Sequence, residues 1–261
     1  MQSHQRIAVV GATGRLGRHV VDVLEERGHD VVAISRSAGV DVITGEGLAE
    51  ALAGVETVVD SATGPSPDEQ AATDFFTTAA QNLQEVGERA GVRRIVVVSI
   101  IGTDRFTGGY GAAKHAHERA MLEGPIPAGI LRAAQFHEFV AQLVDWGRHD
   151  GVSNVPTMRT QLVAARAVAE GVADLATGPE AALAPGSAGL PIPEIAGPRE
   201  ESLVEAASLL VSRSGDPVRI EGVTVPPDFY GDLNESGALL PGPGAILVGP
   251  TFEEWVEKEY S

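Results

Sequence analysis

The chain of 261 residues contains no cysteine. Disulfide bridges, thiolate metal sites and a cysteine nucleophile are therefore excluded. The seven histidines show neither HxxxH nor HExxH spacing, so we expect no metal site. A serine in a G-x-S-x-G setting is also missing, which disfavours a serine hydrolase.

Basic residues and long apolar runs are scarce as well. Lysine and arginine number 19 against 36 aspartates and glutamates, and the formal net charge is −17. A surface this acidic repels nucleic-acid phosphates, so we expect no direct binding of DNA or RNA. No apolar run approaches the roughly 18 residues that cross a bilayer, and residues 1–6 do not resemble a signal peptide. We therefore expect a cytoplasmic protein with no membrane contact.

The remaining sequence alternates between strand and helix patterns, which predicts an α/β fold: a Rossmann-type, doubly wound parallel sheet with a small C-terminal substrate lobe. We expect residues 1–150 to form the main domain around this sheet. Residues 151–261 would complete the cover of the sheet and form the C-terminal substrate-binding lobe. The expected strands are 7–10, 31–34, 40–43, 57–60, 94–99, 129–131, 191–196 and 218–220, and the expected helices are 16–27, 48–53, 68–90, 111–122, 136–146, 164–176, 201–211 and 252–258.

Residues 6–36 contain the most informative pattern. A buried strand runs into Gly11-x-x-Gly14-x-x-Gly17, an amphipathic helix follows, and a second strand comes next. In this context the glycines let the backbone approach a pyrophosphate at a helix N-terminus. The sequence therefore predicts a dinucleotide site formed by Gly11, Thr13, Gly14, Arg15, Leu16 and Gly17. Residues 1–150 are accordingly expected to be an NAD(P)-binding Rossmann domain.

The end of the second strand indicates which dinucleotide is preferred. NAD sites place an acid there to bind the ribose hydroxyls, but this chain has Ser35-Arg36-Ser37, and Asp30 lies at the opposite end of the strand. An arginine flanked by hydroxyls suits a 2′-phosphate, and Arg15 is a second candidate for that contact. We therefore favour NADP (NADPH) over NAD as the cofactor.

A second pattern, Tyr110-x-x-x-Lys114, indicates chemistry. Residues four apart share a helix face, and a lysine ammonium beside a phenol favours the phenolate needed for acid/base catalysis. With three tyrosines and two lysines in the chain, chance predicts roughly 0.02 such pairs. We interpret His115 and His117 as ordinary solvated or half-buried histidines on other faces of this helix.

Taken in order, Gly11-x-x-Gly14-x-x-Gly17, Ser99 and Tyr110-x-x-x-Lys114 resemble the short-chain dehydrogenase/reductase superfamily. The segments 97–102 and 130–136 resemble its atypical and extended members, in particular the NmrA-like NAD(P)-binding branch. The Ser99-to-Tyr110 spacing is slightly shorter than usual, and a phenylalanine (75 or 76) replaces an asparagine found in extended members.

The resemblance also implies roles for individual residues. Tyr110 would be the general acid/base, Lys114 would tune it and bind the nicotinamide ribose, and Ser99 would orient the substrate carbonyl. Further cofactor contacts are implied for Asp41 at the adenine, for Ser61, Ala62 and Thr63 along the adenine ribose, and for Gln135 and Phe136 near the nicotinamide.

Three functions are compatible with these patterns. The leading hypothesis is an NAD(P)-dependent oxidoreductase that transfers hydride from NADPH to a small carbonyl- or quinone-type substrate. One alternative is an NmrA-like redox sensor that binds NADP(H) without turnover, and another is a sugar-nucleotide epimerase or dehydratase. We expect a monomer or homodimer. His137 is a weaker candidate for the substrate pocket, as are Phe229, Tyr230 and Trp255, for which core packing is favoured.

Overall fold

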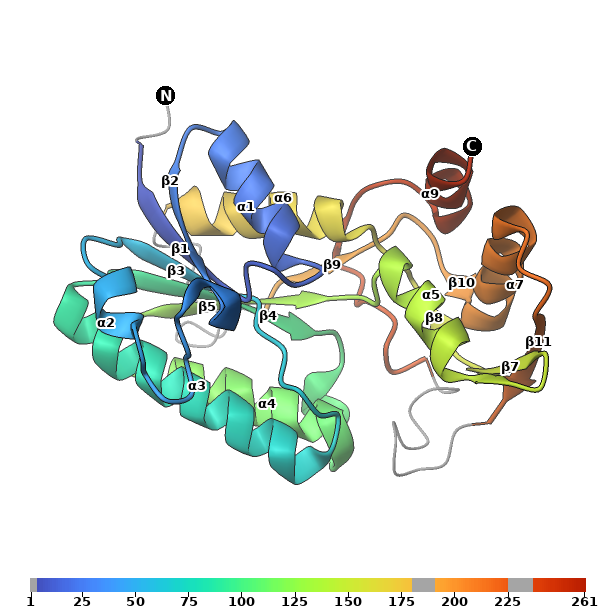
Figure 1. Ribbon diagram of the computed structural model, residues 1–261, viewed down its shortest axis with the longest axis horizontal. Helices are drawn as coiled ribbons and strands as arrows, with labels where there is room; N and C mark the ends of the chain where they lie inside the picture. Colours follow the sequence, from blue (N-terminus) through green and yellow to red (C-terminus); the bar gives the residue numbers. More distant parts are fainter. Residues whose placement is uncertain (1–3, 180–190, 225–236) are drawn as a thin grey trace.

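A seven-stranded parallel sheet forms the centre of the molecule in the computed structural model, which describes residues 4–179, 191–224 and 237–261 (Figure 1). The strand order is β12-β9-β5-β4-β3-β1-β2. The chain places β2 on one side of β1 and then continues with β3 on the other side, as in doubly wound sheets. The strands are β1 (Arg6–Val10), β2 (Asp30–Ile34), β3 (Thr57–Asp60), β4 (Arg94–Ile100), β5 (Ala128–Ala133), β9 (Glu194–Ala196) and β12 (Ile246–Leu247).

Helices cover both faces of this sheet (Figure 1). One face packs against α1 (Gly17–Glu26) and α6 (Ala165–Thr177), and the other against α2 (Leu48–Ala51), α3 (Glu69–Ala90) and α4 (Gly109–Leu122). Successive strand residues point to opposite faces, so Val9 packs with the first group of helices and Ala8 with the second. The near-continuous apolar strands therefore supply two separate cores.

The long helix α3 shows why the sequence predicts its ends well. Asp68 precedes it, and the Asp68 carboxylate accepts a hydrogen bond from the Ala71 backbone at 3.0 Å. Gly91 ends it with a φ of 82°, a left-handed conformation that favours glycine.

The C-terminal lobe has a core of its own, in which Val140, Leu210 and Phe252 are buried together. The chain returns from this lobe to the main sheet twice, at β9 and at β12, so more than one chain segment connects the lobe to the sheet. Its elements are α5 (His137–Trp146), β6 (Arg148–His149), β7 (Val152–Pro156), β8 (Arg159–Thr160), β10 (Glu201–Ser202), α7 (Leu203–Ser214), β11 (Arg219–Val223) and α9 (Phe252–Glu259).

The expected strand at residues 40–43 is wrong, because this segment forms a turn. The Asp41 carboxylate accepts hydrogen bonds from the Ile43 and Thr44 backbone at 2.7 and 3.3 Å. Asn82 of α3 donates to the carbonyls of Val42 and Ile43 at 2.8 and 2.9 Å. A side chain 40 residues away thus satisfies groups that a strand would have paired in the sheet.

Among the helices of the described part of the chain, none is both long and apolar enough to cross a bilayer. The same residues contain no group of three or more metal-ligating side chains. Phe229 and Tyr230, considered above for the pocket roof, lie outside the described residues.

Candidate active site

A cleft of about 1020 Å³ opens at the carboxyl ends of the sheet strands, where open α/β sheets bind ligands. It collects almost all of the residues that the sequence singles out. Those that line it are Gly11, Thr13, Gly14, Arg15, Leu16, Arg36, Asp41, Ser61, Ala62, Thr63, Ser99, Tyr110, Lys114, Gln135 and Phe136.

The glycine loop forms a close-approach cradle in this cleft. Gly11 has a φ of +75°, and a Cβ there would lie 2.9 Å from the Ala62 Cα. A Cβ on Gly17 would lie 2.1 Å from the Gly11 carbonyl oxygen, so Gly17 packs behind the loop rather than lining the cleft. This backbone, followed at once by the N-terminus of α1, fits a dinucleotide pyrophosphate.

The tip of β2 presents hydroxyls and a cation to the cleft. Ser35 and Arg36 line it, and Ser35 Oγ lies 2.9 Å from Ser37 Oγ. Asp30 is the first residue of β2, at the far end of the strand, where it pairs with Arg6 at 3.0 Å. The strand tip thus carries a cation in the position where NAD-selective sites carry an acid.

Arg15 extends from the glycine loop toward α5. Its Nη2 donates to Gln142 Oε1 at 2.7 Å, and its guanidinium lies 6.0 Å from the centre of the Phe139 ring. Arg15 therefore links the glycine loop to the first helix of the C-terminal lobe.

The loop after β3 passes directly over the glycine loop. Ser61 Oγ donates to the Val10 carbonyl at 2.7 Å, and the Ala62 backbone donates to Asp60 Oδ1 at 3.0 Å. These bonds fix the backbone of the loop after β3 beside the glycine loop.

Tyr110 and Lys114 both lie on the cleft-facing side of α4. Both contact Phe76 of α3: the Tyr110 ring meets it edge-on at 5.8 Å between centroids, and Lys114 Nζ lies 4.5 Å from its centroid. Lys114 is only 4% exposed, and its Nζ donates to the Val98 carbonyl at 2.9 Å. The ammonium is therefore anchored to β4 beside Ser99, which is 3% exposed.

His117 joins this group, which corrects its interpretation as a solvated or half-buried side chain on another face. It is fully buried, and its Nδ1 lies 3.2 Å from Lys114 Nζ. Its Nε2 lies 3.0 Å from Asp60 Oδ2, and its ring stacks on Phe76 at 4.8 Å. Residues three apart share a helix face, a signal that was present in the sequence. His115, by contrast, is half-buried as expected and faces Glu118 at 3.8 Å.

Burial and mutual charge shift the pKa values of Lys114, His117 and Asp60. It lowers the pKa of Lys114 to about 8, while Asp60 and Glu118 oppose the shift. Burial and the charge of Lys114 lower the pKa of His117. Burial is the largest influence on Asp60 and acts to raise its pKa. The hydrogen bond and charge of His117, the Ala62 backbone N–H and the charge of Lys114 together outweigh burial, so the pKa of Asp60 is lowered. His117 is therefore neutral near pH 7, with Nε2–H donating to the Asp60 carboxylate and Nδ1 accepting from Lys114.

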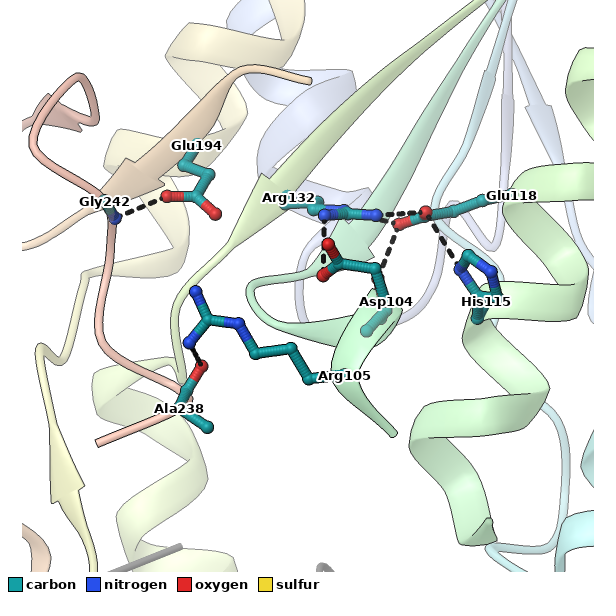
Figure 2. A network of polar contacts seen from close by, with 9 residues as sticks. Asp104, Arg105, His115, Glu118, Arg132, Glu194, Ala238 and Gly242 are labelled. Carbon is teal, nitrogen blue, oxygen red and sulfur yellow. Dashed lines mark hydrogen bonds and ion pairs between the residues drawn. The ribbon is translucent and has the colours of Figure 1, made fainter. Parts of the chain in front are cut away.

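An ion-pair network fixes α4 to β5 (Figure 2). Arg132 donates through Nε and Nη2 to the two Glu118 oxygens at 3.0 and 2.7 Å, and through Nη1 to Asp104 at 3.0 Å. Thr103 adds a hydrogen bond to Glu118 at 2.9 Å. Burial is the largest influence on Glu118 and acts to raise its pKa, but the hydrogen bonds and charge of Arg132, joined by neighbouring hydroxyls such as that of Thr103, together bring the pKa below its usual value. This network holds the helix that carries Tyr110 and Lys114.

Two candidates for the substrate pocket lie elsewhere. His137 is fully buried, its ring 5.3 Å from Phe252 and 5.4 Å from Trp255, and burial lowers its pKa to about 4. It and Trp255 belong to the core of the C-terminal lobe. Gln135, in contrast, lines the cleft and accepts a hydrogen bond from Thr160 Oγ1 at 2.6 Å.

Aromatic side chains form part of the cleft wall. Phe75, Phe136, Phe139 and Trp146 all line it. The Phe139 and Trp146 rings meet edge-on at 5.7 Å, and Trp146 is 60% exposed.

Comparison with known proteins relates the N-terminal half of the chain to NAD(P)H-binding proteins. Residues 11–138 match the family described as NAD(P)H-binding. The photosystem II assembly factor Ycf39 of Synechocystis is 30% identical over 110 residues, which are 37% of this chain and 34% of that protein. A 3-beta-hydroxysteroid dehydrogenase of Mycolicibacterium neoaurum is 30% identical over 112 residues, 35% of this chain and 31% of the enzyme. The chain thus covers about a third of the length of these curated relatives.

Solved structures extend the likeness to almost the whole chain. The Bordetella bronchiseptica enzyme WbmH, in complex with NAD⁺, superimposes with a TM-score of 0.71 at 17% identity, covering 97% of this chain and 96% of that one. The dTDP-4-dehydrorhamnose reductase of Bacillus anthracis, in complex with NADP, gives 0.68 at 17% identity, covering 97% and 98%. Residues 11–138 therefore resemble an NAD(P)H-binding family, and the chain shares its fold with these NAD⁺- and NADP-bound enzymes.

Proposed function

We propose that the protein is an NADP(H)-dependent oxidoreductase that reduces a small carbonyl- or quinone-type substrate. The observation that carries this proposal is the placement of Tyr110 and Lys114 in the same cleft as the glycine loop. A protein that only holds a dinucleotide has no need of an acid/base pair at that position.

The residues of the cleft fit NADP(H). The glycine loop and the N-terminus of α1 would hold the pyrophosphate, and Arg36 with Ser35 would bind the 2′-phosphate. Asp41 would meet the adenine, and Gln135 with Phe136 would border the nicotinamide. When bound, this cofactor supplies a hydride to the substrate carbonyl carbon.

Tyr110 would then give its phenolic proton to the carbonyl oxygen, which becomes the alcohol of the product. The Lys114 ammonium stabilises the phenolate that remains, and solvent protons restore the phenol. Ser99 would hold the carbonyl oxygen by a hydrogen bond during this transfer.

The aromatic residues of the cleft wall favour a flat, apolar substrate. Phe75, Phe136, Phe139 and Trp146 offer ring faces and edges on which an aryl ketone or quinone can pack. This supports a compact carbonyl compound over the UDP-glucose bound by the related structure MoeE5. We propose that such a small molecule is the partner of a monomer or homodimer.

A direct test combines binding and turnover. We expect NADPH to bind more tightly than NADH in a fluorescence titration, and NADPH to be consumed with at least one member of a panel of aryl ketones, aldehydes and quinones. Binding without consumption across the panel would instead identify a redox sensor of the NmrA-like kind. Cofactor that stays bound through purification, with turnover of a nucleotide sugar and no net redox change, would identify an epimerase or dehydratase.

A further inference from the structure

We propose that Asp60 and His117 are positioning residues for Lys114, so that the chemical unit of the cleft is the chain Asp60–His117–Lys114–Tyr110 rather than a tyrosine–lysine pair. This inference rests on the proposed function, because it assigns a task to residues behind the acid/base pair. The two added residues come from different elements: Asp60 ends β3, and His117 lies one turn beyond Lys114 on α4.

The geometry gives each side-chain oxygen of Asp60 and each ring nitrogen of His117 one partner. The Asp60 carboxylate takes the Ala62 backbone N–H on Oδ1 and His117 Nε2 on Oδ2, at 3.0 Å each. His117 then has only Nδ1 left, and this atom lies 3.2 Å from Lys114 Nζ. Because an ionised carboxylate only accepts hydrogen bonds, His117 must carry its proton on Nε2 and accept from the ammonium on Nδ1.

Counting hydrogen-bond partners in the same way shows how many N–H donors of Lys114 are left for the cleft. An ammonium has three N–H donors, of which one is directed to Val98 O and one to His117. One donor therefore remains for the cleft, where Tyr110 and a bound ribose compete for it. The two partners fix the direction of that donor, and the face of Phe76 closes the side toward α3.

Burial makes this arrangement sensitive to charge. Asp60, His117 and Lys114 are 1%, 0% and 4% exposed, so their mutual interactions are weakly screened. The charged or titratable groups around Lys114 are Asp60 from β3 and His117, Glu118 and Tyr110 from α4, with Arg132 of β5 paired to Glu118. The sides toward β4 and α3 present the Val98 carbonyl and the Phe76 ring.

The composition of the chain allows a direct measurement. Lys114 and Lys258 are its only lysines, so a Lys258→Arg background carries a single lysine. In protein labelled with ¹³C at lysine Cε, an NMR pH titration of that background reports the Lys114 pKa without any substrate. We expect a value well below that of an ordinary lysine in the parent.

Three substitutions in this background test the two positioning residues. Asp60→Asn keeps a hydrogen-bond acceptor for His117 but removes the charge, so the Lys114 pKa should fall by about 1 pH unit or more. His117→Leu removes the bridge and should also move the Lys114 resonance and its pKa. His117→Gln, whose amide can donate to Asp60 and accept from Lys114, should restore values close to the parent.

The matched control is His115→Gln, on the same helix but facing Glu118 at 3.8 Å. It should leave the Lys114 pKa close to the parent value. If His117→Leu does not fold, the Asp60→Asn and His117→Gln titrations still decide the question. A Lys114 pKa near that of an ordinary lysine, or one that Asp60→Asn leaves unchanged, overturns the inference.

Turnover separates this inference from the proposed function. With an accepted substrate, the pH of half-maximal kcat should shift in the same direction as the NMR-measured pKa in Asp60→Asn, and His117→Gln should recover kcat lost in His117→Leu. Failure of the parent to oxidise NADPH would refute the oxidoreductase while the NMR coupling still stands. Normal turnover with an uncoupled Lys114 would refute only the positioning role.

Discussion

Arg132 of β5 donates two hydrogen bonds from its guanidinium to the carboxylate of Glu118 in α4, at 3.0 and 2.7 Å. Glu118 is only 1% exposed. This contact fixes the helix of Tyr110 and Lys114 to the sheet (Figure 2). Arg132→Met leaves the Glu118 carboxylate buried without its main partner, so we expect a loss of about 3–5 kcal/mol in the free energy of unfolding, measured by urea denaturation.

The same helix supplies the control for this prediction. Arg119 pairs with Glu123 at 3.3 Å, but the two side chains are 67% and 69% exposed. Arg119→Met should therefore cost at most about 1 kcal/mol. Equal losses in the two variants would show that the Arg132 contact does not hold the helix.

His137 should make the protein sensitive to acid. Burial lowers its pKa to about 4 in the folded chain, and its ordinary value is about 6.5, so the unfolded chain binds the proton first. The stability held above pH 6.5 is lost as the pH falls toward 4, by about 3 kcal/mol. His137→Phe should flatten this part of the pH–stability curve. His149→Gln, at a side chain 82% exposed, should leave the curve unchanged, and an unchanged curve in His137→Phe would contradict the account.

Arg36 should determine the choice between the two dinucleotides. Removing a charge-assisted contact to the 2′-phosphate costs roughly 1.5–3 kcal/mol, so Arg36→Ser should weaken NADPH binding by about 10-fold or more. NADH lacks that phosphate, and its Kd should change little. A fluorescence titration with both dinucleotides measures the effect, and an equal loss for NADH would assign Arg36 a general structural role.

Gly17 should be needed for the cofactor loop although it lies behind it. A Cβ at this position would meet the Gly11 carbonyl oxygen at 2.1 Å, which forces the loop to move. We expect Gly17→Ala to weaken NADPH binding by about 10-fold or more. Gly244→Ala is the control, since no atom lies within 4 Å of a Cβ there. Wild-type affinity in Gly17→Ala would mean that the loop tolerates another shape.

The sequence predicts the parts of this molecule that depend on neighbours along the chain. The glycine loop follows from spacing within seven residues, and the ends of α3 follow from Asp68 and Gly91. Tyr110 and Lys114 reach the same cleft because four residues complete about one helical turn.

Interactions between distant residues account for what the sequence does not reveal. His117 is on the face of Lys114, but its burial depends on Asp60, which is 57 residues away. The Val40–Ile43 segment alternates like a strand, and only the Asn82 side chain shows that its carbonyls are bonded elsewhere. The placement of His137 in the lobe core depends on Phe252, more than a hundred residues further along the chain.

NADPH oxidation by Tyr110→Phe tests whether Tyr110 is the acid/base group of a reductase. With a substrate that the wild type reduces, we predict a fall in kcat of about 100-fold or more while the Kd for NADPH stays within about twofold. An unchanged kcat in Tyr110→Phe would contradict the account.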